Sequence, residues 1–163
     1  MKPCIFFWHE YENNGFLSNW YKAPFVIDGV EYHSVEQYMM AEKTGKFGDP
    51  EACKLIMQSD DPEECKAIGR NASIDIKAWD AVSRDVVYKA NRAKFEQHDD
   101  LRESLLATGD AILAEANPGD KVWGIALGVK DGTATDPDKW PGANKLGEIL
   151  MQLRDEFRSA DGE

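Results

Sequence analysis

The residue best suited to chemistry in this chain is a glutamate at the start of an expected helix. Ser34-Val35-Glu36-Gln37 has the pattern of a capping box, in which the Ser34 side chain accepts from the Gln37 amide and Gln37 reaches back to Ser34. Glu36 then lies at the second helical position, where free amides and the helix dipole favour a negative charge. An ionised carboxylate there could stabilise or attack an oxocarbenium-like sugar cation, as cleavage of a ribosyl–nitrogen bond requires.

A lysine follows on the same expected helix. Lys43 comes seven residues after Glu36, so both side chains fall on one helix face, two turns apart. A cation at that position could anchor a phosphate or a ribose hydroxyl. The alternative is ordinary: acidic residues in a first turn usually only stabilise the helix, and a single lysine is usually solvated. Spacing alone leaves both interpretations open.

A second candidate segment combines a tryptophan with a glycine. Within Lys121–Gly128, Trp123 could offer a flat face to a base, and Gly124 could let a ligand approach the backbone. The alternative is a core tryptophan on a strand.

The third candidate leads into the last helix, over Trp140–Gly147. Backbone amides at a helix N-terminus that is entered through Gly142 and Asn144 suit a phosphate or a diphosphate. The alternative is that Asn144 is only the N-cap and that Gly147 only allows close packing. These two interpretations have equal weight.

Several common catalytic and metal-binding patterns are absent from the sequence. There is no Walker A loop, no Gly-x-Gly-x-x-Gly after a strand and no Gly-x-Ser-x-Gly elbow. His9, His33 and His98 are widely spaced, and there is no His-Glu-x-x-His or Cys-x-x-Cys. Tetrahedral zinc sites usually show close ligand pairs, so we expect neither a metal nor another cofactor. Carboxylate chemistry remains.

The net charge restricts the partners. With 19 basic and 30 acidic residues the chain carries a net charge of −11, which argues against tight non-specific binding along duplex nucleic acid. A local basic pocket could still hold one nucleotide or a strand end. A basic stretch against this acidic background could face an anionic ligand, although a salt-bridged helix surface is commoner. It comprises Arg70, Lys77, Arg84, Lys89, Arg92 and Lys94.

The cysteines and the hydropathy indicate the compartment. Three cysteines with no close pair (Cys4, Cys53 and Cys65) argue against a disulfide framework and for a reducing environment. The apolar run Ile5–Trp8 is too short for a signal-peptide core or a membrane span. We therefore expect a cytoplasmic protein with no membrane partner.

The expected strands are few and short. Cys4–Trp8 is typical of a buried strand, and Val122–Leu127 is expected to return to the sheet. Between them, Asp28-Gly29 separates residues 25–27 from residues 30–32, which predicts a hairpin with a type I′ turn. Residues 128–142 are expected to form a loop.

Helices are expected to dominate the remainder. The capped helix should end near Thr44, stopped by Gly45. Asp-Pro-Glu at residues 49–51 and 61–63 predicts two short helices, the second closed by Gly69. A longer helix should run from about residue 79 or 80 to residue 96, and residues 101–106 continue the helical region. The expected buried face of this longer helix comprises Val82, Val86, Ala90 and Ala93.

The last helix has the clearest periodicity. An amphipathic stripe is formed by Leu146, Ile149, Leu150, Leu153 and Phe157. Residues 159–163 should fray beyond it. The sequence thus predicts one α+β domain over residues 1–163, a small β-sheet with a hairpin wrapped by several helices.

In order and spacing, several blocks of the chain resemble the NADAR family from Phe6 to Arg154. The early blocks are Gly15–Trp20, Tyr32–Lys43 and Phe47–Asp49; the later ones are Gly69-Arg70, Ala93–His98, Val122–Ile125, Gly142–Gly147 and Leu150–Arg154. The chain departs from the family at Gln37-Tyr38, where members often have His or Trp. It departs again at Lys130-Asp131, where members often have an acidic pair.

This resemblance implies a function and a site. Family members hydrolyse N-glycosidic bonds to ribose 5-phosphate or ADP-ribose, and their catalytic glutamate falls on Glu36. Expected ligand-binding residues are Asn19, Lys43, Arg70, Trp79, Lys94, Trp123, Gly124, Asp131 and Asn144.

The leading hypothesis is removal of ADP-ribose from ADP-ribosylated guanine in nucleic acid, so the expected partners are ADP-ribose or a ribose-phosphate ligand and an ADP-ribosylated nucleic acid. One alternative is an N-glycosidase acting on phosphoribosylamino-pyrimidine intermediates of riboflavin biosynthesis. Another is a module that binds ADP-ribose without cleaving it.

Overall fold

The computed structural model describes residues 1–162 and confirms the α+β class. The chain divides into two compact units: unit 1 comprises Met1–Ser18 and Asp99–Glu163, and unit 2 comprises Asn19–His98. The four strands of the described chain form two two-stranded sheets rather than one. The strands are β1 (Cys4–Phe7), β2 (Phe25–Ile27), β3 (Val30–Tyr32) and β4 (Ile112–Glu115). The helices are α1 (Val35–Phe47), α2 (Pro50–Gln58), α3 (Pro62–Asn71), α4 (Ile76–Gln97), α5 (Asp99–Leu106) and α6 (Lys145–Ala160), with 3-10 turns at Gly15–Leu17 and Pro137–Lys139.

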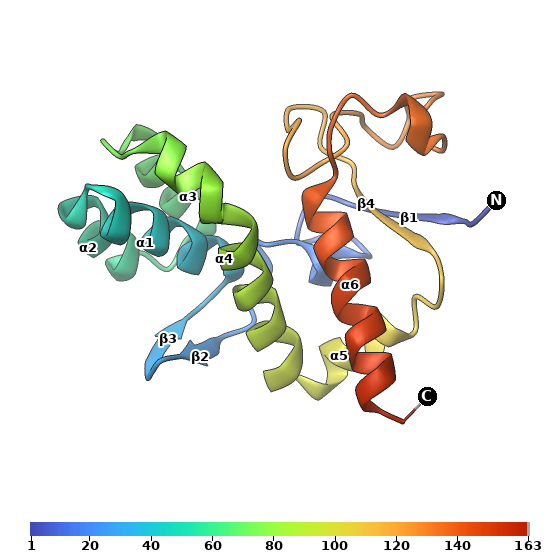
Figure 1. The fold of residues 1–163 in the computed structure, drawn as a ribbon, viewed down its shortest axis with the longest axis horizontal. Coiled ribbons are helices and arrows are strands. Elements are labelled where there is room, and N and C mark those ends of the chain that lie inside the picture. The colour runs from blue at the N-terminus through green and yellow to red at the C-terminus, as the bar shows by residue number, and fades with distance from the viewer. Residues whose placement is uncertain (163) are drawn as a thin grey trace. The chain divides into compact units, whose positions relative to one another are not determined.

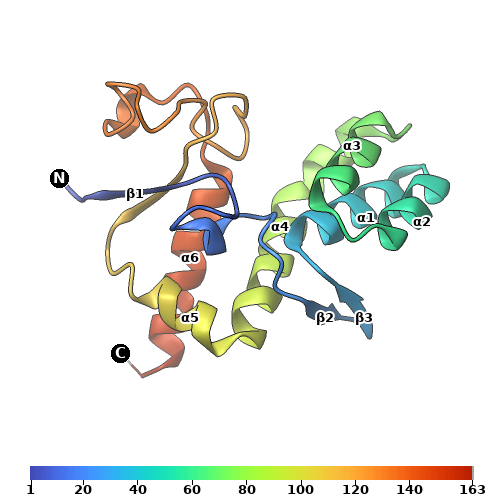
Figure 2. The ribbon, with the colours of Figure 1, turned by 180° about the vertical axis from the view of Figure 1, so that it is seen from behind.

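Unit 2 is built around α1, which packs against α2, α3 and α4 (Figure 1). The hairpin of β2 and β3 precedes α1, and β2 lies against α4 (Figure 2). Asp28 and Gly29 both have positive φ, 51° and 80°, as a type I′ turn requires. The predicted hairpin and its turn are confirmed.

The start of α1 is capped as expected, with one difference. The Ser34 hydroxyl accepts from the Gln37 amide at 3.2 Å. The Gln37 side chain does not return to Ser34: its Oε1 accepts from the backbone N–H of His33 at 2.9 Å, and its Nε2 donates to the carbonyl oxygens of Ile56 and Ser59. Gln37 therefore joins the first turn of α1 to the end of α2.

The predicted end of this helix, at Gly45, is wrong. The helix continues to Phe47 and ends at Gly48, which has φ 130°. A Cβ on Gly45 would lie 3.1 Å from Cys53 Sγ, so this glycine allows α2 to pack closely instead of ending the helix. Gly69 has a similar role in α3, where a Cβ would overlap the Met40 side chain, and α3 likewise continues past it to Asn71.

The predicted starts of α2 and α3 are confirmed. Asp49 Oδ1 accepts from the Ala52 amide at 3.1 Å, and Asp61 Oδ1 accepts from the Glu63 amide at 2.9 Å. A proline follows each cap in the first turn, where its missing N–H removes no helical hydrogen bond.

The long helix α4 begins earlier than expected and buries a different face. Asp75 caps it, so the helix starts at Ile76. Val82 is exposed and Val86 is half-buried, so their predicted place in the core is wrong. Polar side chains occupy part of the buried face instead. That face comprises Trp79, Ser83, Val87, Ala90, Asn91, Ala93, Lys94 and Phe95.

Unit 1 pairs the two ends of the chain. Strand β1 lies parallel to β4, in the register Cys4↔Ile112 to Phe7↔Glu115, and α6 packs on β4 (Figures 1 and 2). The predicted hydrophobic stripe of α6 is buried. The helix continues through Ala160, into the segment expected to fray, and Asp161 pairs with Arg102 at 2.6 Å; Glu163 lies outside the described residues.

The expected strand over residues 122–127 is not formed. Its backbone instead joins the turn before α6, since the carbonyl oxygens of Trp123 and Gly124 accept from the amides of Leu146 and Asn144. Ala126 has φ 61°, which an extended strand does not allow. The strand that pairs with β1 is β4, which the sequence interpretation missed. In residues 1–162, no helix is both long and apolar enough to cross a membrane.

Candidate active site

Glu36 lies in the first turn of α1 with only 5% of its surface exposed. Its backbone N–H donates to the carbonyl oxygen of Asn19 at 3.0 Å, so the preceding loop fixes the entry to the helix. Its charge also reaches α3: burial raises the pKa of the Cys65 thiol to about 11, and Glu36 adds to that rise. A carboxylate is thus held in a sheltered position at the dipole-positive end of a helix.

Three further charged groups act on the same region, and together with Glu36 they form what we call the α1 charge cluster. Burial lowers the pKa of the Lys43 ammonium; the charges of Glu36 and Asp80 oppose this effect, and the charge of Arg70 adds to it. The cluster therefore draws one carboxylate and one cation from α1, a cation from α3 and a carboxylate from α4. Two cations whose charges act in the same region as a buried carboxylate could bind an anionic ligand while the carboxylate faces a developing positive charge.

Asp80 was missed by the sequence analysis. It has a solvent-exposed side chain in the first turns of α4, directly after Trp79. The sequence did contain one signal for Asp80, namely that it directly follows Trp79, which the resemblance had marked as a site residue. Its contribution becomes visible only once α4 packs on α1.

Two further predicted site residues of unit 2, the aromatic Trp79 and the basic Lys94, lie on α4. Trp79 is buried and meets Phe47 edge-to-face, with ring centroids 5.9 Å apart. Lys94 is fully buried, and its Nζ lies 5.5 Å from the Tyr21 ring centroid and 5.0 Å from that of Phe95. Burial lowers the Lys94 pKa to about 7. A lysine that can be neutral near physiological pH is common at functional sites.

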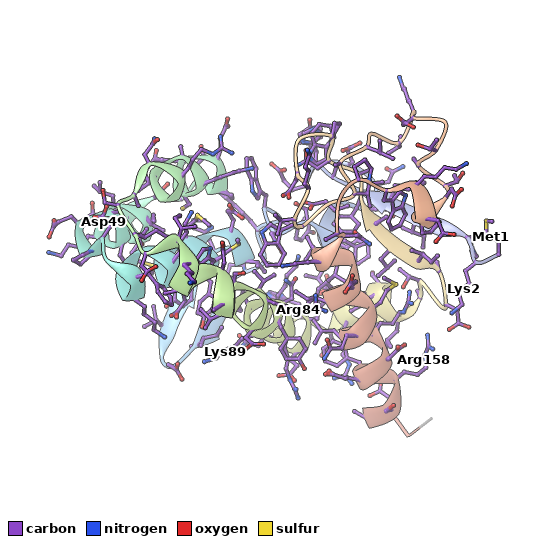
Figure 3. The ribbon with its side chains drawn as sticks, turned by 45° about the horizontal axis from the view of Figure 1, so that its top comes forward. Met1, Lys2, Asp49, Arg84, Lys89 and Arg158 are labelled. Carbon is purple, nitrogen blue, oxygen red and sulfur yellow. The ribbon has the colours of Figure 1, made fainter. Side chains whose placement is uncertain are left out.

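Of the remaining basic residues of α4, Lys77, Lys89 and Arg92 are exposed and Arg84 is half-buried. Figure 3 shows Arg84 and Lys89 on this helix, and Lys89 Nζ pairs with Asp28 at 3.5 Å. Arg92 pairs with Glu96 one turn away at 2.6 Å. For Lys89 and Arg92 the structure shows the salt-bridged helix surface that the sequence left as the alternative.

The burial of Lys94 predicts how the free energy of unfolding depends on pH. Because the Lys94 pKa is lower in the folded chain than in the unfolded chain, the unfolded state binds more protons between about pH 7 and its own pKa. The free energy of unfolding should therefore rise with pH from about 7 upward. In Lys94→Met this rise should be smaller, and the variant should gain most stability relative to wild type below pH 7. Urea denaturation at pH 6, 7.5 and 9 measures both curves, and parallel curves would contradict the prediction.

Three of the predicted site residues of unit 1, Trp123, Gly124 and Asn144, meet at the start of α6, through the backbone of the first two and the side chain of the third. Asn144 is buried with φ 51°; its Nδ2 donates to the Leu113 carbonyl oxygen at 2.9 Å and its Oδ1 accepts from the Glu115 amide at 3.1 Å. A Cβ on Gly124 would lie 2.8 Å from the Glu115 carbonyl oxygen, so this glycine admits β4. Trp123 is half-buried, and its amide donates to Asp120. Ligand binding by these three residues stays a prediction.

Asp131 lies in the long loop and is exposed. Its Oδ1 accepts from both the amide and the hydroxyl of Thr133, at 2.9 and 2.7 Å, and these hydrogen bonds lower its pKa. The carboxylate is therefore engaged in shaping a turn, and its proposed contact with a ligand is likewise untested.

Unit 1 also contains a pocket that the sequence analysis did not identify. It has a volume of about 460 Å³, within the range of small-molecule sites. Next to it, Trp8, His9 and Tyr11 stack, with successive ring centroids 4.0 and 5.0 Å apart. The available signal was the aromatic run Phe6-Phe7-Trp8, which was interpreted only as a strand. The pocket is lined by Phe6, Phe7, Trp8, Glu12, Asn13, Asn14, Gly128, Val129 and Lys130.

Comparisons with known proteins extend over most of the chain. Residues 6–158 match the model of the NADAR domain. "N-glycosidase R617" of Acanthamoeba polyphaga mimivirus is 40% identical over 146 residues, which cover 86% of each chain. "N-glycosidase YbiA" of Escherichia coli (strain K12) is 35% identical over 94% of this chain and 88% of its own. The NMR structure of the E. coli protein YbiA matches with a TM-score of 0.81 and 32% identity, over 99% of this chain and 89% of that chain.

Proposed function

Because the chain belongs to the NADAR domain family, we propose that it hydrolyses N-glycosidic bonds, and specifically that it removes ADP-ribose from ADP-ribosylated guanine in nucleic acid. Relatives named N-glycosidases support the reaction class. The observation that carries the proposal is the buried Glu36 carboxylate, which shares the α1 charge cluster with two cations.

The chemistry follows from the position of this carboxylate. When the bond between the anomeric carbon and the base nitrogen breaks, its electron pair leaves with the base and the ribosyl ring becomes an oxocarbenium ion. Glu36 stabilises that cation or bonds to its anomeric carbon. Water then adds to the anomeric carbon, displacing the Glu36 carboxylate where the two have bonded. Its oxygen becomes the new hydroxyl, and its remaining proton is transferred to the nitrogen of the departing base. No step needs a metal ion.

The cations of the cluster suit the anionic part of the substrate. Lys43 and Arg70 lie on different helices of unit 2, and their charges act on each other, so both can face one phosphate-bearing group. Local cations of this kind accommodate a nucleotide although the chain as a whole has a net charge of −11.

A smaller substrate is the second candidate. Two cations are enough for a single phosphate, so the α1 charge cluster also suits a phosphoribosylamino-pyrimidine of riboflavin biosynthesis. The bond chemistry at Glu36 would be the same.

The test is to present both substrates to the purified chain. We expect chromatographic release of ADP-ribose from an oligonucleotide that carries one ADP-ribosylated guanosine, and none from the same oligonucleotide ADP-ribosylated at thymidine. Turnover of the phosphoribosylamino-pyrimidine alone would replace the first substrate with the second. Tight ADP-ribose binding in calorimetry with no product from either substrate would instead identify a binding module.

A further inference from the structure

Asn91 is a fully buried asparagine in the middle of α4. Its Oδ1 is buried, and no described residue donates a hydrogen bond to it. Burying a carboxamide with an unsatisfied oxygen lowers stability compared with an apolar side chain of similar size. An apolar side chain would avoid this cost, so the hydrogen bonds that Asn91 does make call for an explanation.

Hydrogen bonds connect the Nδ2 of Asn91 to Glu36 through one intermediate residue, Asn19. Asn91 Nδ2 donates to Asn19 Oδ1 at 3.2 Å and to the Val87 carbonyl oxygen at 3.0 Å. The backbone carbonyl oxygen of Asn19 in turn accepts the N–H of Glu36 at 3.0 Å. Asn91, Asn19 and Glu36 thus link α4, the loop before β2 and the first turn of α1.

This link fixes which way the Asn19 carboxamide points. A carboxamide has an acceptor end and a donor end. Asn91 turns its donor end to Asn19, because the same Nδ2 also donates to the Val87 carbonyl oxygen, which can only accept. Asn19 Oδ1 therefore faces Asn91, and the Nδ2 of Asn19 is directed to the opposite side. The Asn19 residue keeps 7% of its surface exposed, and across residues 1–162 its Nδ2 is not among the buried nitrogens that lack a partner. Its donor end is accordingly at the accessible edge of this side chain.

We propose that Asn91 is a positioning residue, which holds the Asn19 carboxamide so that its Nδ2 donates to an oxygen of the ribosyl group beside Glu36. Such an oxygen is a sugar hydroxyl or a phosphate oxygen, since both accept hydrogen bonds. The inference rests on the proposed function for the identity of the reacting group. The orientation of Asn19 itself rests on the contacts described above.

The first experiment replaces Asn91 with leucine, which has a similar size and no orphan oxygen. We expect Asn91→Leu to unfold at the same or higher urea concentration than wild type, and to lose roughly tenfold in kcat/KM, as for loss of a well-placed hydrogen bond. Asn19→Ala, which removes the donor but keeps the backbone carbonyl that Glu36 uses, should give a similar loss. The double variant should lose little more than either single variant.

Gln97→Met is the matched control. It removes a carboxamide from the same helix, but one whose partners are the backbone N–H and carbonyl of Val26 at the hairpin. We expect it to lower stability without lowering kcat/KM. A loss of stability in Asn91→Leu with unchanged kcat/KM would show that Asn91 is purely structural and would overturn the proposal, as would additive losses in the double variant.

A second readout separates this inference from the reaction itself. In ¹⁵N NMR spectra, ribose 5-phosphate should shift the side-chain NH₂ signal of Asn19 in wild type and in Gln97→Met, but not in Asn91→Leu. This response should be seen even if the chain cleaves neither N-glycoside, in which case only the proposed function fails. An equal shift in Asn91→Leu would refute the positioning role.

Discussion

Glu36→Gln is expected to lower the rate of ADP-ribose release by at least about 100-fold while leaving substrate binding largely intact. The substitution keeps the size and one acceptor oxygen of the buried side chain, replaces the other oxygen with an NH₂ group and removes the negative charge. That charge acts mainly on the oxocarbenium-like transition state, so kcat should fall much more than KM changes. Single-turnover chromatography of both proteins, with calorimetric binding of ADP-ribose, measures the two effects separately.

Glu42→Gln is the matched control for this variant. Glu42 lies on the same helix, and its half-buried carboxylate pairs with Lys46 at 2.6 Å. The rate of Glu42→Gln should stay within about twofold of wild type, because the Glu42 charge acts on Tyr32, Tyr38 and Lys46 and not on the α1 charge cluster. Equal rates in Glu36→Gln and wild type would remove Glu36 from the mechanism.

Gly147→Ala is expected to lower the free energy of unfolding by about 3 kcal/mol or more, because it overpacks a rigid contact. A Cβ at this position would overlap the Leu113 carbonyl oxygen and the Asn144 carboxamide. Neither can move freely, since Asn144 Nδ2 donates to that same carbonyl oxygen. The substitution therefore separates α6 from β4. Urea denaturation followed by circular dichroism measures the loss.

Gly132→Ala provides the comparison in the same unit. A Cβ there would meet no atom within 4 Å, and its φ is not in the left-handed region. The urea midpoint of Gly132→Ala should match that of wild type within experimental error. A Gly147→Ala protein as stable as Gly132→Ala would mean that α6 tolerates a displacement from β4.

The elements that sequence predicts best are those whose ends depend on local hydrogen bonds. Asp49, Asp61 and Ser34 cap their helices through their own side chains, and Asp28-Gly29 adopts the positive φ values that the turn needs. These interactions involve residues close in the chain, so their patterns are sufficient to predict them.

Tertiary packing explains the elements that were predicted wrongly. Gly45 is a helix breaker by propensity, yet it is inside α1 because α2 passes close to it. Val82 fits an apolar stripe, yet α4 turns Ser83 and Asn91 toward the interior instead. In both positions the neighbouring element decides, and no local pattern contains that element.

The candidate site divides in the same way. Spacing put Glu36 and Lys43 on one helix face, the resemblance marked both as site residues, and the structure places both in the α1 charge cluster. Asp80 and Asn91 come from α4, and their relation to Glu36 exists only after α4 packs on α1. The pocket that Trp8 lines similarly combines residues 6–14 with residues 128–130, which are far apart in the sequence.

The pairing of β1 with β4 also bears on the order in which the chain can fold. Unit 2 is a continuous segment, Asn19–His98, whereas unit 1 joins Met1–Ser18 to Asp99–Glu163. On a ribosome, which releases the N-terminus first, every residue of unit 2 is available before β4 has been synthesised. Strand β1 must meanwhile remain an unpaired edge, with its aromatic residues exposed to other nascent chains. Unit 1 is therefore the unit whose long-range contacts form slowly. Between the synthesis of β1 and that of β4, a chaperone would protect the growing chain.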